Sequence, residues 1–152
     1  MPEQTRNYYI REMRREDLEK VTALEAACFS MPWKYRDFEE ALLNQHRVYL
    51  VAETDRHGII GGCRLTDIAG EGDISNVAVY ESFRGRKVAT ALLNSLLEYG
   101  EERYGITAFT LEVRSKNTAA IRLYENAGFR SEGVRPGFYD RPKDDAIIMW
   151  KR

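Results

Sequence analysis

The sequence predicts an α/β (α+β) fold with a mixed, mostly antiparallel sheet, a central parallel pair of strands and helices on both faces. Three observations predict this class. Short apolar runs of strand length are interspersed with longer segments in which apolar residues recur at helical spacing. Turn residues separate several strand runs by only a few positions, as in antiparallel hairpins. One long helical segment lies between two strand runs, and a crossover of that kind joins parallel strands.

The first half of the chain predicts one strand, two helices and three further strands. The polarity of Tyr8–Met13 alternates, as expected for an opening strand. Acidic residues followed by apolar residues at near-helical spacing predict a first helix, which Pro32 stops. A second short helix is expected over Tyr35–Asn44. The three strands are expected at Val48–Glu53, Ile59–Leu65 and Ile74–Val79, the last one preceded by a turn over residues 69–73.

The second half of the chain predicts the crossover and the end of the sheet. A broad apolar stripe over Val88–Arg103 predicts a long helix, which Gly105 ends. Phe109–Val113 is expected as a central strand. Asn117 is a suitable N-cap for a last helix and Gly128 a suitable residue for its C-terminal end. Two strands, at 129–135 and 146–151, complete the expected order βααβββαβαββ.

Length and composition favour one globular domain over residues 1–152. The net charge of -1 provides no overall basic field for nucleic acid. The apolar runs are well short of the roughly 20 residues that span a bilayer, and the N-terminal segment lacks the apolar core of a signal peptide. We therefore expect a cytoplasmic protein without direct contacts to nucleic acid or membrane, and we expect a monomer.

The cysteines and histidines argue against two common kinds of catalytic site. Cys28 and Cys63 are far apart in the chain and belong to no CxxC pattern, which disfavours a zinc site and favours reduced thiols. His46 and His57 are the only histidines, and both lie in polar, turn-like surroundings. A Ser-His-Asp or Cys-His mechanism would need one of them and is not expected. No metal is expected.

A basic turn precedes the long helix and raises the possibility of an anion site. Arg84, Arg86 and Lys87 surround Gly85 directly before the helix starts at Val88. The start of a helix already carries a partial positive charge, so further cations there are unfavourable unless an anion binds. Free backbone N–H groups at a helix start, flanked by basic side chains, form such a site. The alternative is a solvated basic turn, and the spacing alone does not choose between them.

Two further residues have both a functional and a structural interpretation. Glu112 interrupts the apolar run of a central strand, where a carboxylate is costly unless it is paired, hydrogen-bonded or functional. The structural alternative is a salt bridge to Arg114 or Arg64, or exposure at the end of the sheet. Tyr124, on the following helix, is by itself more typical of a core or rim residue.

Together these features resemble the GNAT acetyltransferase superfamily over nearly the whole chain, and in particular the RimI-type ribosomal-protein-alanine N-acetyltransferases. The run LEVR-x-x-N-x-x-A-I-x-L-Y-E-x-x-G-F is the most specific motif. The resemblance implies the GNAT fold. The segments that carry it are Ala23–Trp33, Ile74–Leu93, Leu111–Phe129 and Gly137–Trp150.

The resemblance also implies acetyl-CoA as cosubstrate. Backbone N–H groups of Gly85–Thr90 would hold its pyrophosphate, and the strand backbone of Val77–Val79 would pair with its pantetheine arm. The asparagine of the family motif corresponds to Asn117. The cofactor-binding residues are therefore expected to be Val77, Ala78, Val79, Arg84, Gly85, Arg86, Lys87, Val88, Ala89, Thr90 and Asn117.

One position departs from the family pattern. The superfamily loop usually has the form Q/R-x-x-G-x-G/A, and here Lys87 occupies the place of its first glycine. A lysine disfavours positive φ because of its Cβ. We therefore predict a helical φ at Lys87, with its ammonium available to a phosphate.

The resemblance assigns Glu112 as general base and Tyr124 as the acid that protonates the sulfur of coenzyme A. A strand N–H near Val79 would hold the oxyanion. With a pKa of about 7.8, an α-amine is roughly 10–15% neutral at pH 7, whereas a lysine at about 10.4 is roughly 0.04% neutral. This difference of about 300-fold, or about 3 kcal/mol, favours an α-amine as acceptor.

The expected acceptor groove contains Pro32, Trp33 and Tyr139, with Asp144 or Asp145 as further candidates. The two aromatic residues could equally cover the core, and the acidic pair could be a solvated turn. The resemblance implies that the acceptor is the N-terminal alanine of a small-subunit ribosomal protein. The alternatives are acetylation of lysine or a small amine such as a polyamine or aminoglycoside, and a non-catalytic acetyl-CoA sensor.

Overall fold

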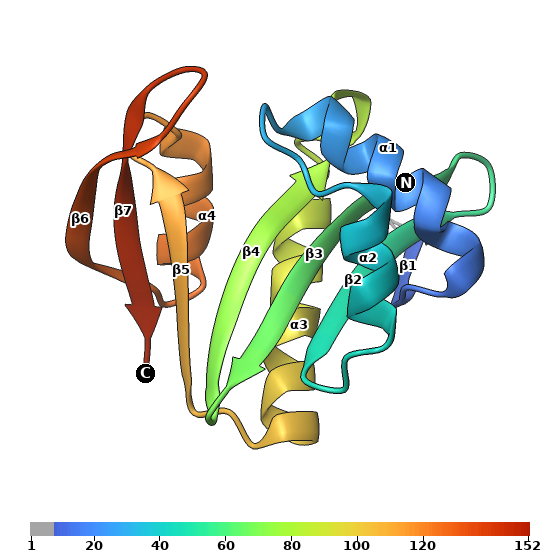
Figure 1. The fold of residues 1–152 in the computed structure, drawn as a ribbon, viewed down its shortest axis with the longest axis horizontal. Coiled ribbons are helices and arrows are strands. Elements are labelled where there is room, and N and C mark those ends of the chain that lie inside the picture. Colours follow the sequence, from blue (N-terminus) through green and yellow to red (C-terminus); the bar gives the residue numbers. More distant parts are fainter. Residues whose placement is uncertain (1–7) are drawn as a thin grey trace.

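The computed structural model describes residues 8–152, apart from the side chain of Asn76; residues 1–7, part of the N-terminal segment discussed above, lie outside it. The predicted order of helices and strands is confirmed (Figure 1). Two short 3₁₀ helices, Arg15–Asp17 and Glu81–Phe83, supplement them. The elements are β1 (Tyr8–Glu12), α1 (Leu18–Cys28), α2 (Tyr35–Leu42), β2 (Arg47–Thr54), β3 (Gly58–Ile68), β4 (Glu71–Val79), α3 (Val88–Tyr104), β5 (Ala108–Arg114), α4 (Thr118–Asn126), β6 (Arg130–Tyr139) and β7 (Asp144–Lys151).

The strands form one sheet in the order β1-β2-β3-β4-β5-β7-β6. The pairing of β4 with β5 is parallel, whereas the other pairs are antiparallel. This confirms the mixed sheet and the crossover through α3. The parallel ladder joins Glu71–Ile74 to Ala108–Leu111, and beyond it the two strands separate, as Figure 1 shows. The separation opens the sheet at Val77–Val79.

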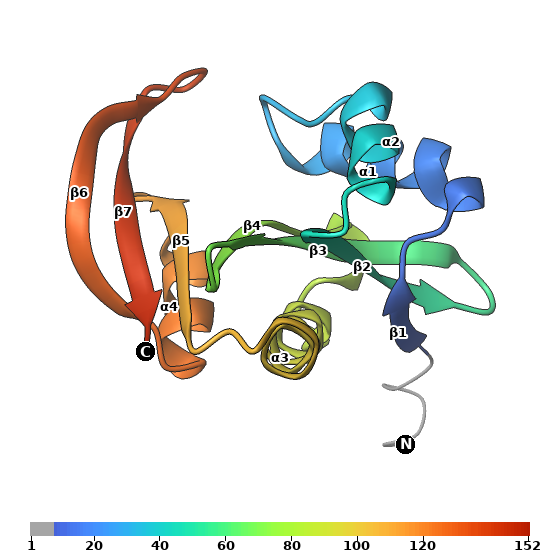
Figure 2. The ribbon, with the colours of Figure 1, turned by 60° about the horizontal axis from the view of Figure 1, so that its bottom comes forward.

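Helices cover both faces of the sheet, each over its own apolar core. α3 and α4 lie on one face, and α1 and α2 lie on the other (Figure 2). The core under α3 includes Leu92, Leu96 and Phe109, and the core under α1 and α2 includes Leu24 and Phe38. All five side chains are at most 2% exposed. Among the described residues, no helix is long and apolar enough to cross a membrane.

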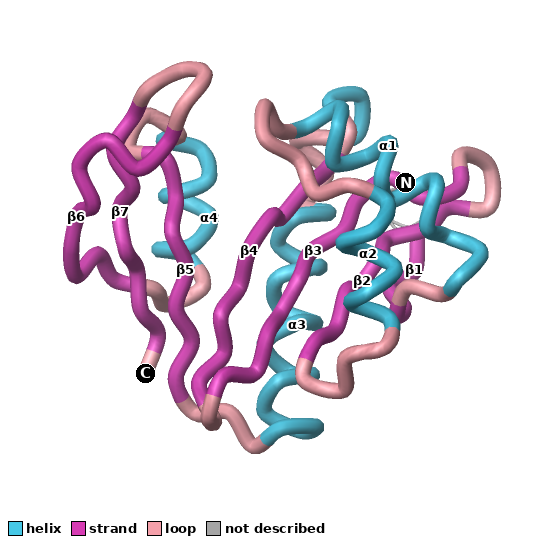
Figure 3. Tube along the Cα trace, in the orientation of Figure 1, coloured by secondary structure: helices cyan, strands magenta, loops and turns pink. Residues whose placement is uncertain are grey.

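Two connecting loops on opposite sides of the strand separation face each other. In Figure 3 the α1–α2 loop and the β6–β7 loop lie at the same end of the molecule, and Figure 2 shows the same proximity. Arg114 at the end of β5 contacts both loops. Its guanidinium donates to the carbonyls of Pro142 (2.6 Å) and Asp140 (3.0 Å) and to the hydroxyl of Ser30 (3.4 Å).

The predicted turn over residues 69–73 is wrong in its second part. The turn consists of Ala69 and Gly70, which both have positive φ, and β4 already begins at Glu71. The segment 71–74 pairs with β3 on one side and β5 on the other. Hydrogen bonding from both neighbours therefore outweighs the local turn preference of glycine and aspartate.

β6 extends four residues beyond its predicted end at Arg135, through Pro136 to Tyr139. A proline is tolerated there because β6 is the edge strand of the sheet, so the missing N–H removes no hydrogen bond to a second neighbour. The pairing of β6 with β7 is irregular between Arg135 and Tyr139.

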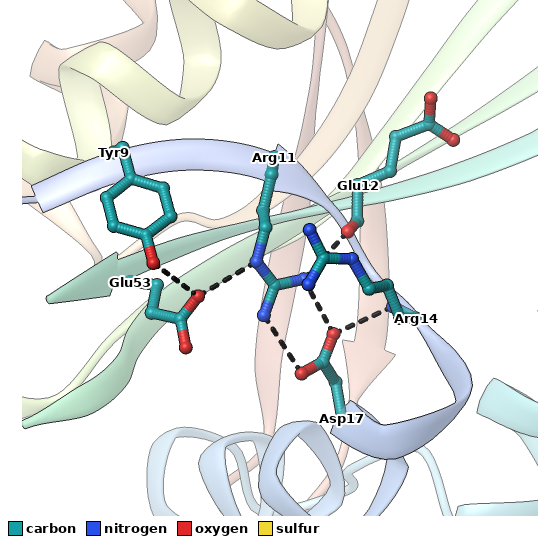
Figure 4. Close-up of polar contacts among 6 residues, drawn as sticks. All are labelled: Tyr9, Arg11, Glu12, Arg14, Asp17 and Glu53. Atoms are coloured by element: carbon teal, nitrogen blue, oxygen red, sulfur yellow. Dashed lines mark hydrogen bonds and ion pairs between the residues drawn. The ribbon is translucent and has the colours of Figure 1, made fainter. Parts of the chain in front are cut away.

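A partly buried ion-pair cluster attaches the start of α1 to the sheet (Figure 4). The guanidinium of Arg11 on β1 donates to both carboxylate oxygens of Asp17, at 2.8 and 3.0 Å, and to Glu53 on β2 at 2.9 Å. The backbone N–H of Arg14 also donates to Asp17 at 2.7 Å. Burial opposes ionisation of Asp17, but these hydrogen bonds outweigh it and lower the pKa of the carboxyl.

Candidate active site

A cavity of about 550 Å³ lies where β4 separates from β5, at the start of α3. We call it the basic-turn cavity. Cys28 and Phe29 close it on the α1 side, and Tyr124 lies at its α4 side. Of the residues predicted to bind acetyl-CoA, it is lined by Val77, Ala78, Val79, Arg84, Gly85, Lys87, Val88, Ala89, Thr90 and Asn117. Arg86 is not among them; its guanidinium lies over the ring of Phe83, 5.4 Å from the centroid.

The predicted helical φ of Lys87 is wrong. Lys87 is the N-cap of α3 and has a left-handed conformation, with φ 62° and ψ 21°. Gly85 has φ +80°, so the chain makes two left-handed steps before it enters α3. This conformation explains the glycine of the family pattern, because a Cβ in the left-handed region costs about 1–2 kcal/mol. Lys87 bears that strain at the mouth of the cavity.

The start of α3 has an excess of positive charge. Its first turn contains no acidic residue, and Lys87 and Arg84 lie beside it at the lining of the cavity. Arg84 Nε donates to the carbonyl oxygen of Val79 at 2.9 Å, which fixes this side chain along the end of β4. Backbone N–H groups of the first helical turn have no acceptor within the helix. An anionic ligand would satisfy them and offset the charge.

A second pocket of about 260 Å³ adjoins the basic-turn cavity on the side of β5. We call it the Glu112 pocket. The two spaces share Cys28, Phe29, Val77, Asn117, Ala120 and Tyr124. The Glu112 pocket adds residues of β5, the α1–α2 loop and the β6–β7 hairpin. The fold thus brings Glu112 and Tyr124 to the lining of one pocket, although they lie on a strand and on a helix.

Glu112 forms an ion pair, but not with the predicted partners. Its Oε2 lies 3.2 Å from Nε of Arg135 on β6, and its side chain is 32% exposed. The guanidinium of Arg114 is instead hydrogen-bonded to the α1–α2 and β6–β7 loops. Arg64 donates to Ser75 and lies beneath the ring of Trp33. The carboxylate is therefore half-buried and accessible, as a proton acceptor for a bound substrate must be.

Tyr124 is 7% exposed, and its helix is held in place by the predicted cap. Asn117 accepts a hydrogen bond from the N–H of Ala120 at 3.1 Å. Burial raises the pKa of Tyr124 above its ordinary value, with smaller contributions from Cys63 and Tyr139. The phenol is consequently protonated at neutral pH and can donate a hydrogen bond or a proton into the pocket.

The residues predicted for an acceptor groove lie in different places. Tyr139 lines the Glu112 pocket, and the guanidinium of Arg114 lies 4.4 Å from its ring centroid. Pro32 and Trp33 do not line this pocket, and Trp33 packs edge-on against Phe38. The acidic pair is engaged in structural contacts: Asp144 accepts from Ser115 at 2.6 Å, and Asp145 accepts from the N–H of Gly137 at 2.8 Å.

Several residues at the site were not among those predicted from the sequence. Cys28, at the end of α1, contributes to both spaces, and its thiol lies 3.5 Å from the carbonyl oxygen of Val79. Arg135, which pairs with Glu112, belongs to β6, whose polar sequence does not distinguish it from its neighbours. The remaining lining residues that sequence reasoning missed are Phe29, Ser30, Met31, Phe83, Val113, Arg114, Ala119, Ala120 and Leu123. Local patterns could not find them because they meet only through the tertiary fold.

The sequence profile of the acetyltransferase (GNAT) family matches residues 9–129. The [ribosomal protein bS18]-alanine N-acetyltransferase of Escherichia coli is 32% identical over 136 residues, which cover 88% of this chain and 89% of that protein. A Bacillus subtilis protein to which the same activity is provisionally assigned is 34% identical over 142 residues, with 93% of each chain covered.

Solved structures with the same fold include two acetyltransferases. The crystal structure of the ribosomal-protein-S18-alanine N-acetyltransferase from Escherichia coli superposes with a TM-score of 0.85 at 27% identity, covering 95% of this chain and 92% of that one. A spermidine N-acetyltransferase from Vibrio cholerae has a TM-score of 0.80 at 21% identity, covering 95% and 93%, and shares the fold. With this fold, this site and these relatives, the chain is an N-acetyltransferase and belongs to the acetyltransferase (GNAT) family.

Proposed function

We propose that this protein transfers the acetyl group of acetyl-CoA to the N-terminal α-amine of a protein, namely the N-terminal alanine of a small-subunit ribosomal protein. The observation that carries the proposal is the common lining of the Glu112 pocket by a carboxylate and a buried phenol, directly beside the basic-turn cavity. The names of the relatives from Escherichia coli and Bacillus subtilis support the acceptor.

The basic charge and the free backbone N–H groups of the basic-turn cavity support acetyl-CoA as its ligand. The backbone N–H groups at the start of α3, with Lys87 and Arg84, would hold the pyrophosphate. The separated backbone of Val77–Val79 would pair with the pantetheine arm as a neighbouring strand does. Acetyl-CoA supplies an activated acyl group, and this placement directs it towards the Glu112 pocket.

Within the pocket, the two side chains have complementary tasks. Glu112 accepts the proton of the attacking amine, directly or through a water molecule. Tyr124, protonated across the neutral range, donates a proton to the leaving sulfur. A backbone N–H near Val79 stabilises the developing oxyanion. A half-buried carboxylate prepares an α-amine for attack more readily than the amine of a lysine, because the neutral fraction of the α-amine at pH 7 is about 300-fold larger.

The charges around the pocket argue against a polyamine as acceptor. Among the acidic residues that the structure describes, Glu112 alone lines the Glu112 pocket. Arg114 lines it as well, and Arg135 is paired with Glu112. A polycation such as spermidine would meet two guanidinium groups there, at an unfavourable Coulomb energy. We propose that the protein acts as a monomer in the cytoplasm, because the described residues of one chain line both the basic-turn cavity and the Glu112 pocket.

The proposal is tested by offering the protein acetyl-CoA with four acceptors and identifying the products by mass spectrometry. The acceptors are a peptide with the N-terminal sequence of bS18, the same peptide with its α-amine blocked, a blocked peptide with an internal lysine, and spermidine. We expect turnover of the free α-amine and its loss on blocking. Equal turnover of free and blocked peptide would refute the proposal.

A further inference from the structure

A half-buried arginine lies beneath the α1–α2 loop, outside both spaces of the active site. Arg64 is on β3, and its guanidinium carbon lies 3.6 Å from the ring centroid of Trp33. Its Nε donates to the hydroxyl of Ser75 at 2.8 Å. Its Nη1 is buried without a hydrogen-bond partner among the residues that the structure describes. The guanidinium therefore lies over the face of the indole ring at a cation–π distance.

The same tryptophan is fixed at its backbone by a buried carboxylate. Glu25 on α1 is 0% exposed, and its Oε1 accepts the N–H of Trp33 at 3.2 Å. The ring of Trp33 also packs edge-on against Phe38 of α2, 5.2 Å between centroids. Trp33 is thus held by α1, α2 and the sheet at once.

Trp33 belongs to the loop 29–34, and the other end of this loop forms a wall of the Glu112 pocket. Phe29, Ser30 and Met31 line that pocket. Met31 is 49% exposed, so packing of its own side chain contributes little to holding this wall in place. Phe29 packs against the core under α1 and α2, and Ser30 contacts Arg114. The position of Met31 therefore depends most on the anchor at Trp33, two residues further along.

Stability alone does not account for the buried charges. Burying a guanidinium and a carboxylate costs free energy, and apolar residues of the same volume are often equally stable or better. Burial also lowers the pKa of Arg64, and the charge of Glu25 opposes this. What an apolar side chain cannot provide is a planar cation that stacks on the indole in one orientation.

We propose that Arg64 is a positioning residue for the acceptor: by stacking on Trp33 it holds the loop 29–34 where Phe29, Ser30 and Met31 form the wall of the Glu112 pocket. The proposal rests on the proposed function in that the acceptor peptide enters this pocket. Arg64 acts through Trp33 and has no direct part in the acetyl transfer.

The decisive variant is the double substitution Glu25→Gln with Arg64→Met. Arg64→Met alone would leave the charge of Glu25 buried and destabilise the protein, whereas the double variant removes both charges. Glutamine retains the oxygen that accepts the N–H of Trp33. Arg64→Lys is a second variant, which keeps the charge but loses the planar stacking. The matched control is Arg103→Met, whose guanidinium lies over Tyr99 and Tyr104, on α3 and far from the loop in the chain.

Two measurements are made on each variant. In a Trp150→Phe background, Trp33 is the only tryptophan, and its quenching by acrylamide reports the accessibility of the loop. We expect about twofold stronger quenching and an acceptor KM raised about tenfold, which is within the range of cation–π contacts. The KM for acetyl-CoA, kcat and the Arg103→Met control should remain unchanged.

Unchanged quenching in both variants, or an unchanged acceptor KM despite stronger quenching, would overturn the proposal. The quenching measurement needs no acceptor. A failure of the proposed α-amine activity would therefore appear as absent turnover in the natural protein, while the quenching still shows whether Arg64 fixes the loop.

Discussion

The basic-turn cavity and the Glu112 pocket adjoin each other but are built in different ways. The cavity takes most of its lining from two nearby segments, 77–79 and 83–90, and it offers backbone groups. The Glu112 pocket is assembled from α1 and its loop, β5, α4 and the β6–β7 hairpin, and it offers side chains. Backbone groups persist when a side chain changes, whereas a side-chain site depends on each residue. Substitutions should therefore have larger effects in the Glu112 pocket.

The largest effect is expected for Glu112→Gln, which keeps the shape of the side chain but removes the proton acceptor. General-base catalysis contributes about 10²–10⁴-fold, so we expect kcat to fall about a thousandfold. The affinity for acetyl-CoA, measured by calorimetry, should stay within about twofold because the basic-turn cavity is intact. An equally large loss of acetyl-CoA affinity would show that Glu112 also contributes to binding in the basic-turn cavity.

The attachment of α1 to the sheet should contribute stability without contributing to catalysis. Asp17→Asn removes the charge of the buried partner of Arg11 and should lower the free energy of unfolding by about 3 kcal/mol. Urea unfolding measures this change. At 25 °C, kcat of the folded fraction should be unchanged, and a large loss of kcat would mean that this cluster shapes the Glu112 pocket.

The same carboxyl predicts a pH dependence of stability. The pKa of Asp17 is lowered in the folded protein, so its contribution is present above the unfolded value of about 3.9. The contribution is lost as pH falls from there through the lowered folded pKa. The Asp17→Asn variant should therefore show a weaker loss of stability with acid. Parallel curves for the two proteins would contradict this assignment.

Tyr124→Phe removes the proposed proton donor while the ring continues to fill its place beside Phe129. We expect kcat to fall about a hundredfold, with acetyl-CoA affinity nearly unchanged. In the natural protein the raised pKa of Tyr124 keeps the phenol protonated in alkaline solution. The rate should thus rise as the acceptor amine loses its proton near pH 7.8 and should show no decline up to about pH 9.5. An earlier decline would exclude Tyr124 as the donor.

The smallest effect is expected at Lys87, within the backbone-built cavity. Lys87→Gly relieves the left-handed strain and should raise stability by about 1 kcal/mol, as thermal unfolding would show. It also removes one exposed charge, so acetyl-CoA should bind up to about fivefold more weakly, with a smaller dependence on salt. Markedly tighter binding would instead show that the Cβ of Lys87 obstructs the phosphate.

Much of the fold could be predicted because its signals are local. Apolar periodicity predicted α3, the capping pattern predicted the start of α4 at Asn117, and the length of the crossover predicted the parallel pair. The errors occurred where neighbours overrode a local preference. β4 extends through Gly72 and Asp73 because strands on both sides provide hydrogen bonds.

The sequence by itself determined that a strand end, a basic turn and a helix start follow one another within about 15 residues, because the signals for these elements are local. It did not determine the left-handed φ of Lys87 or the part of the cavity lining that comes from α1 and α4. Only the tertiary structure decided that Arg135 pairs with Glu112, that Arg64 stacks on Trp33 and that Cys28 lies at the junction of the two spaces. The physical reason is separation along the chain. Each of these contacts joins residues more than 20 positions apart, and only the strand order of the sheet and the packing of helices on it bring them together.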